Sequence, residues 1–500
     1  MKRIIAPFVC LAFAARLAAA VPGMPDEIVV QAAFSTNRSA RAVRDVPARL
    51  DLSNVFGFAA DVTIGDLSQF SHLDLHLKSG GGWYNFVMSP EKEGVAERLA
   101  FRVKDGKKEG EPKGLDSISG IRISGWRAGT NDTFITLRNF SVLDEAGFAA
   151  IEAAKDRTPR ACPMPENGEV RAFWCHSSRG LGKGYDWDSS VAFLRKHGYN
   201  TLLVNLAWPG VAFYKSSVLP EYVHLDAEGD RLVQCLAACR KYGVSCHVWK
   251  VCYNAGHMED MTEFNRRMAA ERRTQVRTDG KDGWLCPSDP RNIKYEIDAM
   301  VELAHKGVDG IHFDFIRYPT DKGCYCDMCR ERFERAVGRK VAQWPEDVKK
   351  GGAMIGEWHS WRVTNITAVV KGVAERVRRE SPQTKISAAV FQNPETTPAM
   401  LGQDWLDWCR KGYLDFVCPM NYGDSAALQR AATALQLRAV SGLPVKVYPG
   451  IGLSVFRKDG CDARRLSEQI AVVRACGAPG FTVFNFDGRA EAALPLIPRQ

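Results

Sequence analysis

The sequence predicts an α/β protein: a (β/α)₈ TIM barrel over residues 169–495, preceded by a β-sandwich domain over residues 25–145. Three observations support this. After residue 168, apolar β-rich runs alternate with helical periods, which is the pattern of repeated βα units. Before residue 145, strand-like alternation dominates and Gly, Asp and Ser mark the turns. The chain of 500 residues, 45% of them hydrophobic, is long enough for more than one core.

The first residues, 1–20, are predicted to be a secretory signal peptide. Lys2 and Arg3 form a charged start, Ile4–Ala15 is apolar, and Ala18–Ala20 offers small residues for cleavage. We therefore expect export to the periplasm or the extracellular space. No later run of about eighteen apolar residues exists, so stable membrane insertion is not expected.

The charge pattern argues against a nucleic-acid partner. The net charge is +9 and the pI is about 8.8, but Lys and Arg residues are scattered along the chain. The densest cluster, around Arg376, Arg378 and Arg379, has the spacing of a solvated helix face. The sequence does not determine the oligomeric state.

The β-sandwich prediction depends on short alternating runs separated by turns. Its aromatic residues Trp83, Tyr84 and Trp126 either fill the core or stack on sugar rings, as in the jelly-roll modules of many secreted glycosidases. A polar, Pro-containing linker is expected over residues 146–168. The predicted strands are Phe58–Ile64, Leu73–Lys78, Trp83–Met88, Leu99–Lys104, Ile121–Trp126 and Phe134–Val142.

The barrel prediction depends on eight apolar runs with amphipathic segments between them. No GxGxxG follows an early strand, so dinucleotide binding has no support, although an open doubly wound sheet could have the same alternation. The extra length falls after the third and fourth strands, where long loops shape a substrate cleft. The predicted strands are Arg171–Cys175, Thr201–Leu206, Ser245–Val251, Gly310–Ile316, Lys385–Phe391, Asp415–Met420, Val445–Ile451 and Gly480–Phe486; predicted helices include Arg231–Tyr242, Arg291–His305, Glu357–Arg379 and Arg464–Cys476.

The most informative stretch is GVDGIHFDFIRYP, over Gly307–Pro319. Its apolar residues form a buried strand, and Asp314, Arg317 and Tyr318 arrive at the strand's C-terminal end. Active sites of TIM barrels are built at that end of the strands. The alternative is that Asp314 only caps the following loop.

Other strand ends carry aromatic and amide side chains. Such groups suit sugars, which present apolar ring faces and many hydroxyls, whereas a phosphate site would need Gly-rich loops and helix N-termini. The predicted substrate-binding residues are Asn205, Trp208, Trp249, Lys250, Asn254, His312, Arg317, Tyr318, Asn421, Tyr422 and Asp487.

Carboxylates near these strand ends are few. Glycoside hydrolysis normally uses two, and Asp314 and Glu395 are the predicted catalytic pair. Arg317 should lower the pKa of Asp314, which suits a nucleophile or base, and leaves Glu395 as proton donor in an apolar setting. Alternatively, Glu395 is a first-turn acid of a helix and Asp487 belongs to a turn.

Fourteen cysteines follow the signal peptide. Cys324, Cys326 and Cys329 form a CYCDMC cluster after the fourth strand, and Cys286 is one candidate for a fourth ligand. They bind a structural zinc ion or form disulfides. The predicted chemistry requires no cofactor, and few His residues occupy strand ends, which disfavours a catalytic metal.

Three blocks of sequence resemble glycosyl hydrolase-like family 10, a group of bacterial TIM-barrel proteins. They are WLCPSDP from Trp284, VDGIHFDFIRYP, and DFVCPMNYG at Asp415–Gly423, and the resemblance covers roughly residues 165–490. It implies an exported glycosidase with Asp314 in the site and a glycan substrate, which for some members is the glycan strand of peptidoglycan. The family's Pro-Gln-x-Tyr pattern is replaced here by Pro419-Met420-Asn421-Tyr422. The alternative is a non-catalytic glycan-binding protein on a degenerate barrel.

Overall fold

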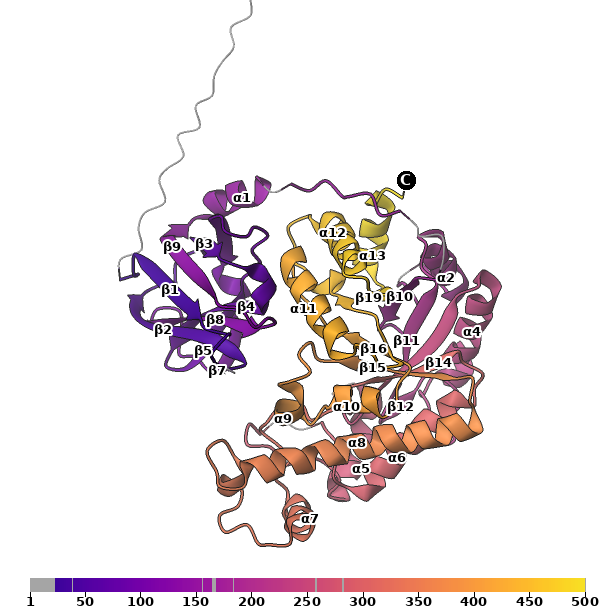
Figure 1. Ribbon diagram of the computed structural model, residues 1–500. Helices are drawn as coiled ribbons and strands as arrows, with labels where there is room; N and C mark the ends of the chain where they lie inside the picture. The colour runs from indigo at the N-terminus through magenta and orange to yellow at the C-terminus, as the bar shows by residue number, and fades with distance from the viewer. Residues whose placement is uncertain are drawn as a thin grey trace, which may run out of the picture.

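The computed structural model describes residues 23–37, 39–154, 156–163, 168–182, 184–256, 259–280 and 283–499. Figure 1 shows a β-rich N-terminal domain beside a larger α/β domain. The predicted signal peptide, residues 1–20, lies outside the described residues. Among the helices of the described residues, none combines the length and the apolar character needed to cross a membrane.

The N-terminal domain is a sandwich of two antiparallel sheets that share one hydrophobic core. In the first sheet the order is β1 (Glu27–Ala32), β9 (Thr133–Leu143), β3 (Gly57–Ile64) and β6 (Glu97–Arg102). In the second it is β2 (Arg41–Leu50), β8 (Ile118–Arg127), β4 (Phe70–Ser79), β5 (Gly81–Val87) and β7 (Lys107–Glu111). All six predicted strands are present. The prediction missed β1, β2 and β7; β7 is exposed along its whole length and carries no apolar signal.

The aromatic residues of the sandwich divide between its core and its outer face. Tyr84 is 6% exposed and belongs to the core. Trp83 is half-buried beneath the guanidinium of Arg122, 4.4 Å from its ring centre, and Trp126 is likewise covered by Arg41 at 5.2 Å. Both tryptophans are nevertheless only half-buried, so each remains partly accessible on the outer face of the sandwich.

The segment predicted as a linker, residues 146–168, begins as a helix, α1 (Glu145–Ala153). Asp144 caps it by accepting a hydrogen bond from the Gly147 N–H at 2.7 Å. Phe148 and Ile151 pack on a small apolar cluster of the sandwich. The segment was predicted to be a linker because most of its residues are polar, although Phe148 and Ile151 attach it to the sandwich.

The predicted TIM barrel is confirmed. In the described residues, eight parallel strands form one sheet that closes on itself, because the seventh strand is split into β17 (Lys446–Val447), which pairs with β16, and β18 (Gly450–Ile451), which pairs with β19. The remaining strands are β10 (Val170–Cys175), β11 (Thr201–Trp208), β13 (Ser245–Val251), β14 (Gly310–Asp314), β15 (Lys385–Val390), β16 (Phe416–Pro419) and β19 (Gly480–Phe484), with the short β12 (Val211–Ala212) beside β11.

Amphipathic helices cover the outside of the barrel (Figure 1). In α6, Asp289 accepts a hydrogen bond from the Arg291 N–H at 2.9 Å, and Pro290 occupies the first helical position. The helices are α2 (Trp187–Lys196), α3 (Leu225–Glu228), α4 (Arg231–Tyr242), α5 (Thr262–Ala270), α6 (Pro290–Ala304), α7 (Asp327–Val337), α8 (Ile355–Glu380), α9 (Thr397–Leu401), α10 (Trp405–Arg410), α11 (Ala426–Ala439), α12 (Asp462–Ala475) and α13 (Gly488–Ala493).

The long connections fall where the sequence predicted them. The segment between β13 and α6 contains α5, and the segment between β14 and α8 contains α7. Both leave from the C-terminal ends of their strands, so both lie on the face of the barrel where catalytic groups collect.

The sandwich packs against α11 and the loops that follow β15 and β16. Leu428 of α11 is 5% exposed and joins the sandwich core. Ser425 Oγ donates to the Pro90 carbonyl at 2.5 Å, and Gln392 Nε2 donates to the Ser71 carbonyl at 2.8 Å. Arg464 and Glu91 form an ion pair at 2.8 Å. The sandwich therefore flanks the C-terminal ends of two barrel strands.

Candidate active site

Inside the barrel, beneath the mouth, hydrogen bonds link the side chains of Trp174, His312 and Ser387. The Trp174 indole N–H donates to His312 Nε2 at 2.9 Å, so the other ring nitrogen, Nδ1, carries the proton and donates to Ser387 Oγ at 2.8 Å. His312 is fully buried, and burial moves its pKa well below the ordinary value. The structure thus places His312 in the core as a neutral group and not on the substrate side.

Asp314 is the carboxylate at the mouth. It ends β14, is 6% exposed, and accepts a hydrogen bond from the Phe315 N–H at 2.7 Å. Phe315 has a φ of 53°, a left-handed conformation that is costly for an aromatic residue. Such strain is common at functional sites, and here it accompanies a peptide N–H directed at the carboxylate.

The predicted direction of the pKa shift of Asp314 is wrong. Burial raises the pKa to about 6, while Arg317 and then the Phe315 N–H oppose the rise. The Trp249 N–H also lowers the pKa slightly, although it forms no hydrogen bond of normal geometry. Desolvation exceeds the attraction of Arg317 because the carboxylate has lost nearly all contact with water.

The guanidinium of Arg317, whose charge acts on this carboxylate, is surrounded by aromatic rings. Its guanidinium carbon lies 4.7 Å from the ring centre of Phe315, 4.9 Å from Phe391 and 5.7 Å from Trp284. Burial lowers the pKa of Arg317 to about 10, and Asp314 opposes that shift. The arginine remains charged at neutral pH.

Several predicted residues meet around Asp314. The Trp208 indole N–H donates to Asn205 Oδ1 at 2.6 Å, and Asn205 Nδ2 donates to the Trp249 carbonyl at 3.2 Å. Tyr422 stacks on Phe484 with ring centres 5.4 Å apart. Burial, followed by the charge of Asp314, raises the pKa of Tyr422 well above its ordinary value, so the phenol stays protonated.

Sequence reasoning missed His176, which directly follows β10. Its exposed ring meets Trp208 and Trp249 edge-on, with ring centres 5.9 Å and 5.6 Å apart. The end of the first strand was the signal that could have identified it.

Lys250 and Tyr318 do not reach the mouth. Successive side chains of a strand point to opposite faces, so with Trp249 inside the barrel, Lys250 points outward, where it forms a fully buried ion pair with Glu296 of α6. Tyr318 is fully buried, lies under the Arg362 guanidinium at 4.2 Å, and accepts a hydrogen bond from Asn365 at 3.2 Å.

Three other predicted residues have local structural partners. Asn254 accepts a hydrogen bond from the Gly256 N–H at 3.0 Å. Asn421 exchanges two hydrogen bonds with Gln436, at 3.0 Å and 2.6 Å. Asp487 caps α13 and accepts a hydrogen bond from Ser454 Oγ at 2.6 Å, as the turn interpretation expected.

Glu395 does not have the apolar setting expected of a proton donor. It is exposed, and its own N–H donates to Asn393 Oδ1 at 2.9 Å. Among the described residues, no second carboxyl contributes to the pKa of Asp314.

The cysteines predicted as ligands come together with Cys286. The sulfur atoms of Cys286, Cys324, Cys326 and Cys329 all lie within 4.8 Å of one another, and all four are free thiols. This cluster joins the segment before α6 to the segment after β14.

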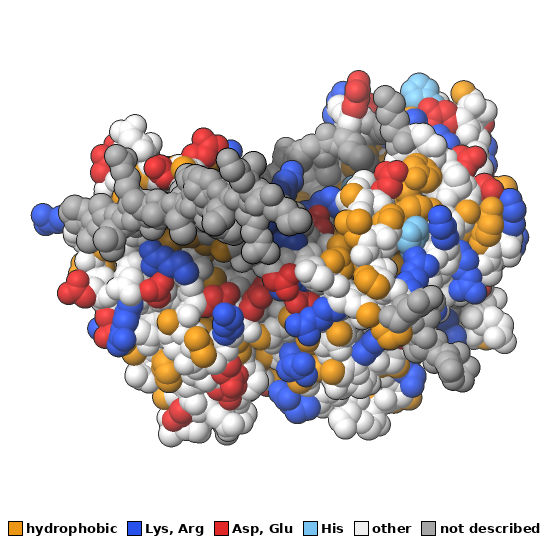
Figure 2. Space-filling model, turned by 90° about the horizontal axis from the view of Figure 1, so that it is seen from above, with side chains coloured by type: hydrophobic (Ala, Val, Ile, Leu, Met, Phe, Trp, Pro, Cys, Tyr) orange, Lys and Arg blue, Asp and Glu red, His pale blue; other side chains and the backbone are white. Residues whose placement is uncertain are grey.

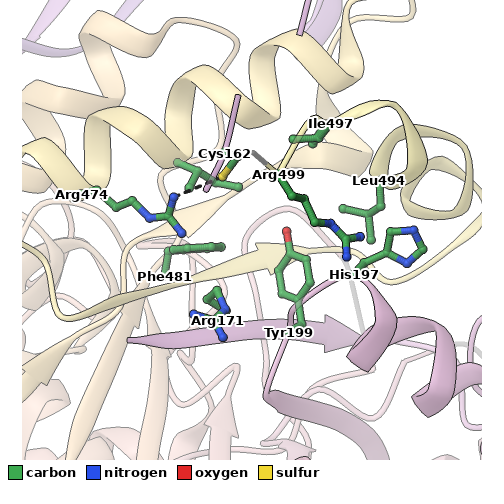
Figure 3. Close-up of a pocket in the computed structure, with 10 residues that line it drawn as sticks. Cys162, Arg171, His197, Tyr199, Arg474, Phe481, Leu494, Ile497 and Arg499 are labelled. Atoms are coloured by element: carbon green, nitrogen blue, oxygen red, sulfur yellow. Dashed lines mark hydrogen bonds between the residues drawn. The ribbon is translucent and has the colours of Figure 1, made fainter. Parts of the chain in front are cut away.

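A cavity at the opposite end of the barrel is not part of this site. It has a volume of about 30 Å³ and is lined by Arg171 and Phe481, near the N-terminal ends of β10 and β19. Figure 3 shows the hydrogen bond from Arg474 to Cys162 Sγ, 3.3 Å long, at its edge. In TIM barrels the N-terminal face of the barrel contributes to stability, and the active site lies at the opposite face.

The surface charges are mixed. Figure 2 shows Lys and Arg side chains interspersed with Asp and Glu over both domains on the visible face. No single-sign patch of the kind that attracts nucleic acid dominates this view.

Similar solved structures include glycosidases of low sequence identity. A β-galactosidase from Bacillus circulans sp. alkalophilus aligns with a TM-score of 0.45 and 14% identity over 64% of this chain and 51% of its own. An agarase aligns with a TM-score of 0.46 and 10% identity over 94% of this chain and 92% of its own. The chain thus spans about half the length of the β-galactosidase.

At the level of sequence, an S-layer-related protein from Niallia circulans is 22% identical over 282 residues, which are 48% of this chain and 17% of that protein. Residues 170–456 match the family described as Glycosyl hydrolase-like 10. The matched range is more than half of the chain and includes Asp314 and the four clustered cysteines. The chain belongs to glycosyl hydrolase-like family 10.

Proposed function

We propose that this protein is an exported glycoside hydrolase that cleaves a polysaccharide or oligosaccharide, with Asp314 at the reaction centre. The observation that carries the proposal is one nearly buried carboxyl at the barrel mouth, with a pKa raised to about 6 and aromatic rings around it. A carboxyl in that pKa range both accepts and returns a proton near neutral pH, as acid–base catalysis requires.

The surroundings of Asp314 suit a sugar. Trp208, His176 and Tyr422 offer ring faces and edges to apolar sugar faces, and Asn205 holds the Trp208 indole in place. Arg317 supplies a fixed positive charge beside the carboxylate. The partly accessible Trp83 and Trp126 of the sandwich are candidates for further glycan contacts. The glycan strands of peptidoglycan are the substrate class to examine first.

Hydrolysis by the usual mechanism needs a second carboxyl about 5–9.5 Å from the first. Glu395 is the proposed partner because it follows β15 at the same end of the barrel. This requirement makes Glu395 the second residue to test.

One observation favours a second candidate, a glycan-binding protein on a degenerate barrel. In the described part of the chain, no other carboxyl influences the pKa of Asp314. A binding site needs only the aromatic and amide groups and no acid pair.

The experiment is to incubate the mature protein with a glycan panel that includes peptidoglycan strands, and to quantify released reducing ends and products by mass spectrometry. Asp314→Asn should reduce turnover by roughly 10²–10⁴-fold while glycan binding persists. Glu395→Gln should show a comparable loss if it is the partner. Asp230→Asn makes the same chemical change at the start of α4 and serves as the control. Near-normal turnover by Asp314→Asn would exclude its catalytic role, and binding without cleavage by the unmodified protein would favour the second candidate.

A further inference from the structure

The four thiols of Cys286, Cys324, Cys326 and Cys329 come from two separate loops of the barrel mouth. Cys286 precedes α6, whereas the others lie between β14 and the first turn of α7. The Cys286 and Cys329 sulfur atoms are 3.4 Å apart, and all four sulfurs lie within 4.8 Å of one another. Cys286, Cys324 and Cys329 are buried, and Cys326 is half-buried.

Hydrogen-bond donors surround these sulfur atoms. The Val276 N–H donates to Cys324 Sγ at 3.4 Å, and the Cys329 N–H donates to Cys326 Sγ at 3.4 Å. Cys326 occupies the N-cap of α7, an eleven-residue helix, where the helix dipole favours a negative charge. Donors directed at sulfur stabilise the thiolate, which is the form of cysteine that binds metals.

A buried cation lies near the cluster. Arg362 is fully buried, and its guanidinium donates to the backbone carbonyls of Met400 and Thr320 at 3.3 Å and 2.6 Å. Among the described residues no carboxylate forms an ion pair with it. Burial lowers its pKa, and the groups that oppose this shift are Tyr318, Tyr325, Asp321 and then Cys329. A buried charge is costly unless an opposite charge accompanies it, and thiolates in the cluster would add to the contribution of Asp321.

We propose that Cys286, Cys324, Cys326 and Cys329 bind one zinc ion that joins the two long loops of the barrel mouth. Four thiolates provide the closed tetrahedral ligand set of a structural zinc site. The ion displaces the four thiol protons on binding, and Arg362 offsets part of the net negative charge that four thiolates and one Zn²⁺ leave. Trp284, two residues before Cys286, contacts Phe315 and Arg317. By fixing Cys286, the ion would also fix the position of Trp284 against Arg317.

A second thiol cluster provides the comparison. Cys235, Cys239 and Cys246 also lie within 4.8 Å of one another, but they are packed in the apolar layer between α4 and β13. In the described part of the chain this cluster has three ligands and no fourth. These three cysteines are therefore interpreted as packing residues of the core. Substituting one of them is a matched control for substituting a proposed zinc ligand.

The test measures the metal content of the full mature chain, purified with a mild reductant and without added metal. We expect about one zinc ion per chain by elemental analysis. Cobalt substitution should give the absorption of a tetrahedral tetrathiolate site. Cys286→Ser should lower zinc affinity at least roughly tenfold, whereas Cys239→Ser should leave the zinc content unchanged. This readout is independent of any glycosidase activity.

A measurement on the unmodified chain covers the case in which Cys286→Ser fails to fold. Zinc is released with a thiol reagent and a chelator and then restored after reduction, while thermal unfolding is followed by circular dichroism. The melting temperature should fall on release and recover with zinc alone. A metal-free chain with a disulfide among the four cysteines, or with four thiols that react freely in the native state, would overturn the proposal. So would zinc that is lost in Cys239→Ser and kept in Cys286→Ser.

Discussion

At the scale of single residues, the site depends on charges that are kept away from water. The ionised form of Asp314 is disfavoured at the barrel mouth, because the cost of burying its charge outweighs the attraction of Arg317. One layer outside, Lys250 pairs with Glu296, which also accepts a hydrogen bond from the Tyr253 N–H at 2.9 Å. Tyr253 has a φ of 59°, so this ion pair supports a second strained residue at a strand end.

The first prediction concerns the pH dependence of stability. The pKa of Asp314 is about 6 in the folded protein and 3.8 in its ordinary setting, so the folded state binds the proton more tightly. Stability should therefore fall as the pH rises from about 4 to about 6, by on the order of 2–3 kcal/mol from this residue. Asp314→Asn cannot ionise, and it should be more stable than the unmodified protein at pH 7.

Chemical denaturation at pH 4 and pH 7 measures this effect. The difference between Asp314→Asn and the unmodified protein should shrink toward pH 4, where both carry a neutral group. Asp230→Asn is again the control, because Asn and Asp are equivalent at a helix N-cap. A lower stability of Asp314→Asn at pH 7 would mean that its ionised carboxylate is stabilised by its surroundings.

At the scale of elements, the strands could be predicted because their signal is local. Ser245–Val251 was predicted with its exact bounds, as was the helix Arg231–Tyr242. Both have apolar periods and clear ends: Asp230 caps α4, and Gly243 ends it with a φ of 62°.

The orientation of side chains beyond the last paired residue could not be predicted in the same way. Lys250 was assigned to the mouth although Trp249 beside it already points inward, and strand alternation alone could have excluded it. Tyr318 lies beyond the end of β14, in a loop whose path depends on contacts with α8. No pattern in the sequence encodes that contact.

The second prediction tests the packing inside the barrel. Gly310 begins β14, and a Cβ placed there would lie 2.1 Å from Nδ1 of the buried His247 ring. Gly310→Ala should therefore destabilise the protein by about 1–3 kcal/mol through overpacking. His247→Ala removes the obstructing ring, so the double variant should be less destabilised than the sum of the two single changes.

Urea denaturation of the four proteins in this cycle gives the coupling energy. Gly423→Ala controls for the loss of a glycine, because a Cβ there would lie in open space and the backbone, like that of Gly310, has no positive φ. Additive effects of Gly310→Ala and His247→Ala would show that the strand shifts to accept the extra carbon.

At the scale of the whole molecule, the sequence predicted two folded units but not how they are joined. The interface uses isolated residues, such as Ser425 and Arg464, that have no periodic signal of their own. Their partners lie more than 300 residues earlier in the chain. The same limit applies to the cysteine cluster, where the position of Cys286 relative to the CYCDMC motif depends on the tertiary fold.

The last prediction is that Leu428 couples the sandwich to the barrel. Its side chain is 5% exposed and belongs to the core of the sandwich although it lies on a barrel helix. Leu428→Ala should cost about 2–5 kcal/mol, and the loss should fall on the contact between the domains rather than on either core. In calorimetry we expect the sandwich to unfold earlier and as a separate transition, with the barrel transition little changed. Leu437→Ala, on the same helix and packed on the barrel core, should instead lower the barrel transition. If Leu428→Ala lowers both transitions equally, the two domains unfold as one cooperative unit and the interface is as integral to stability as either core.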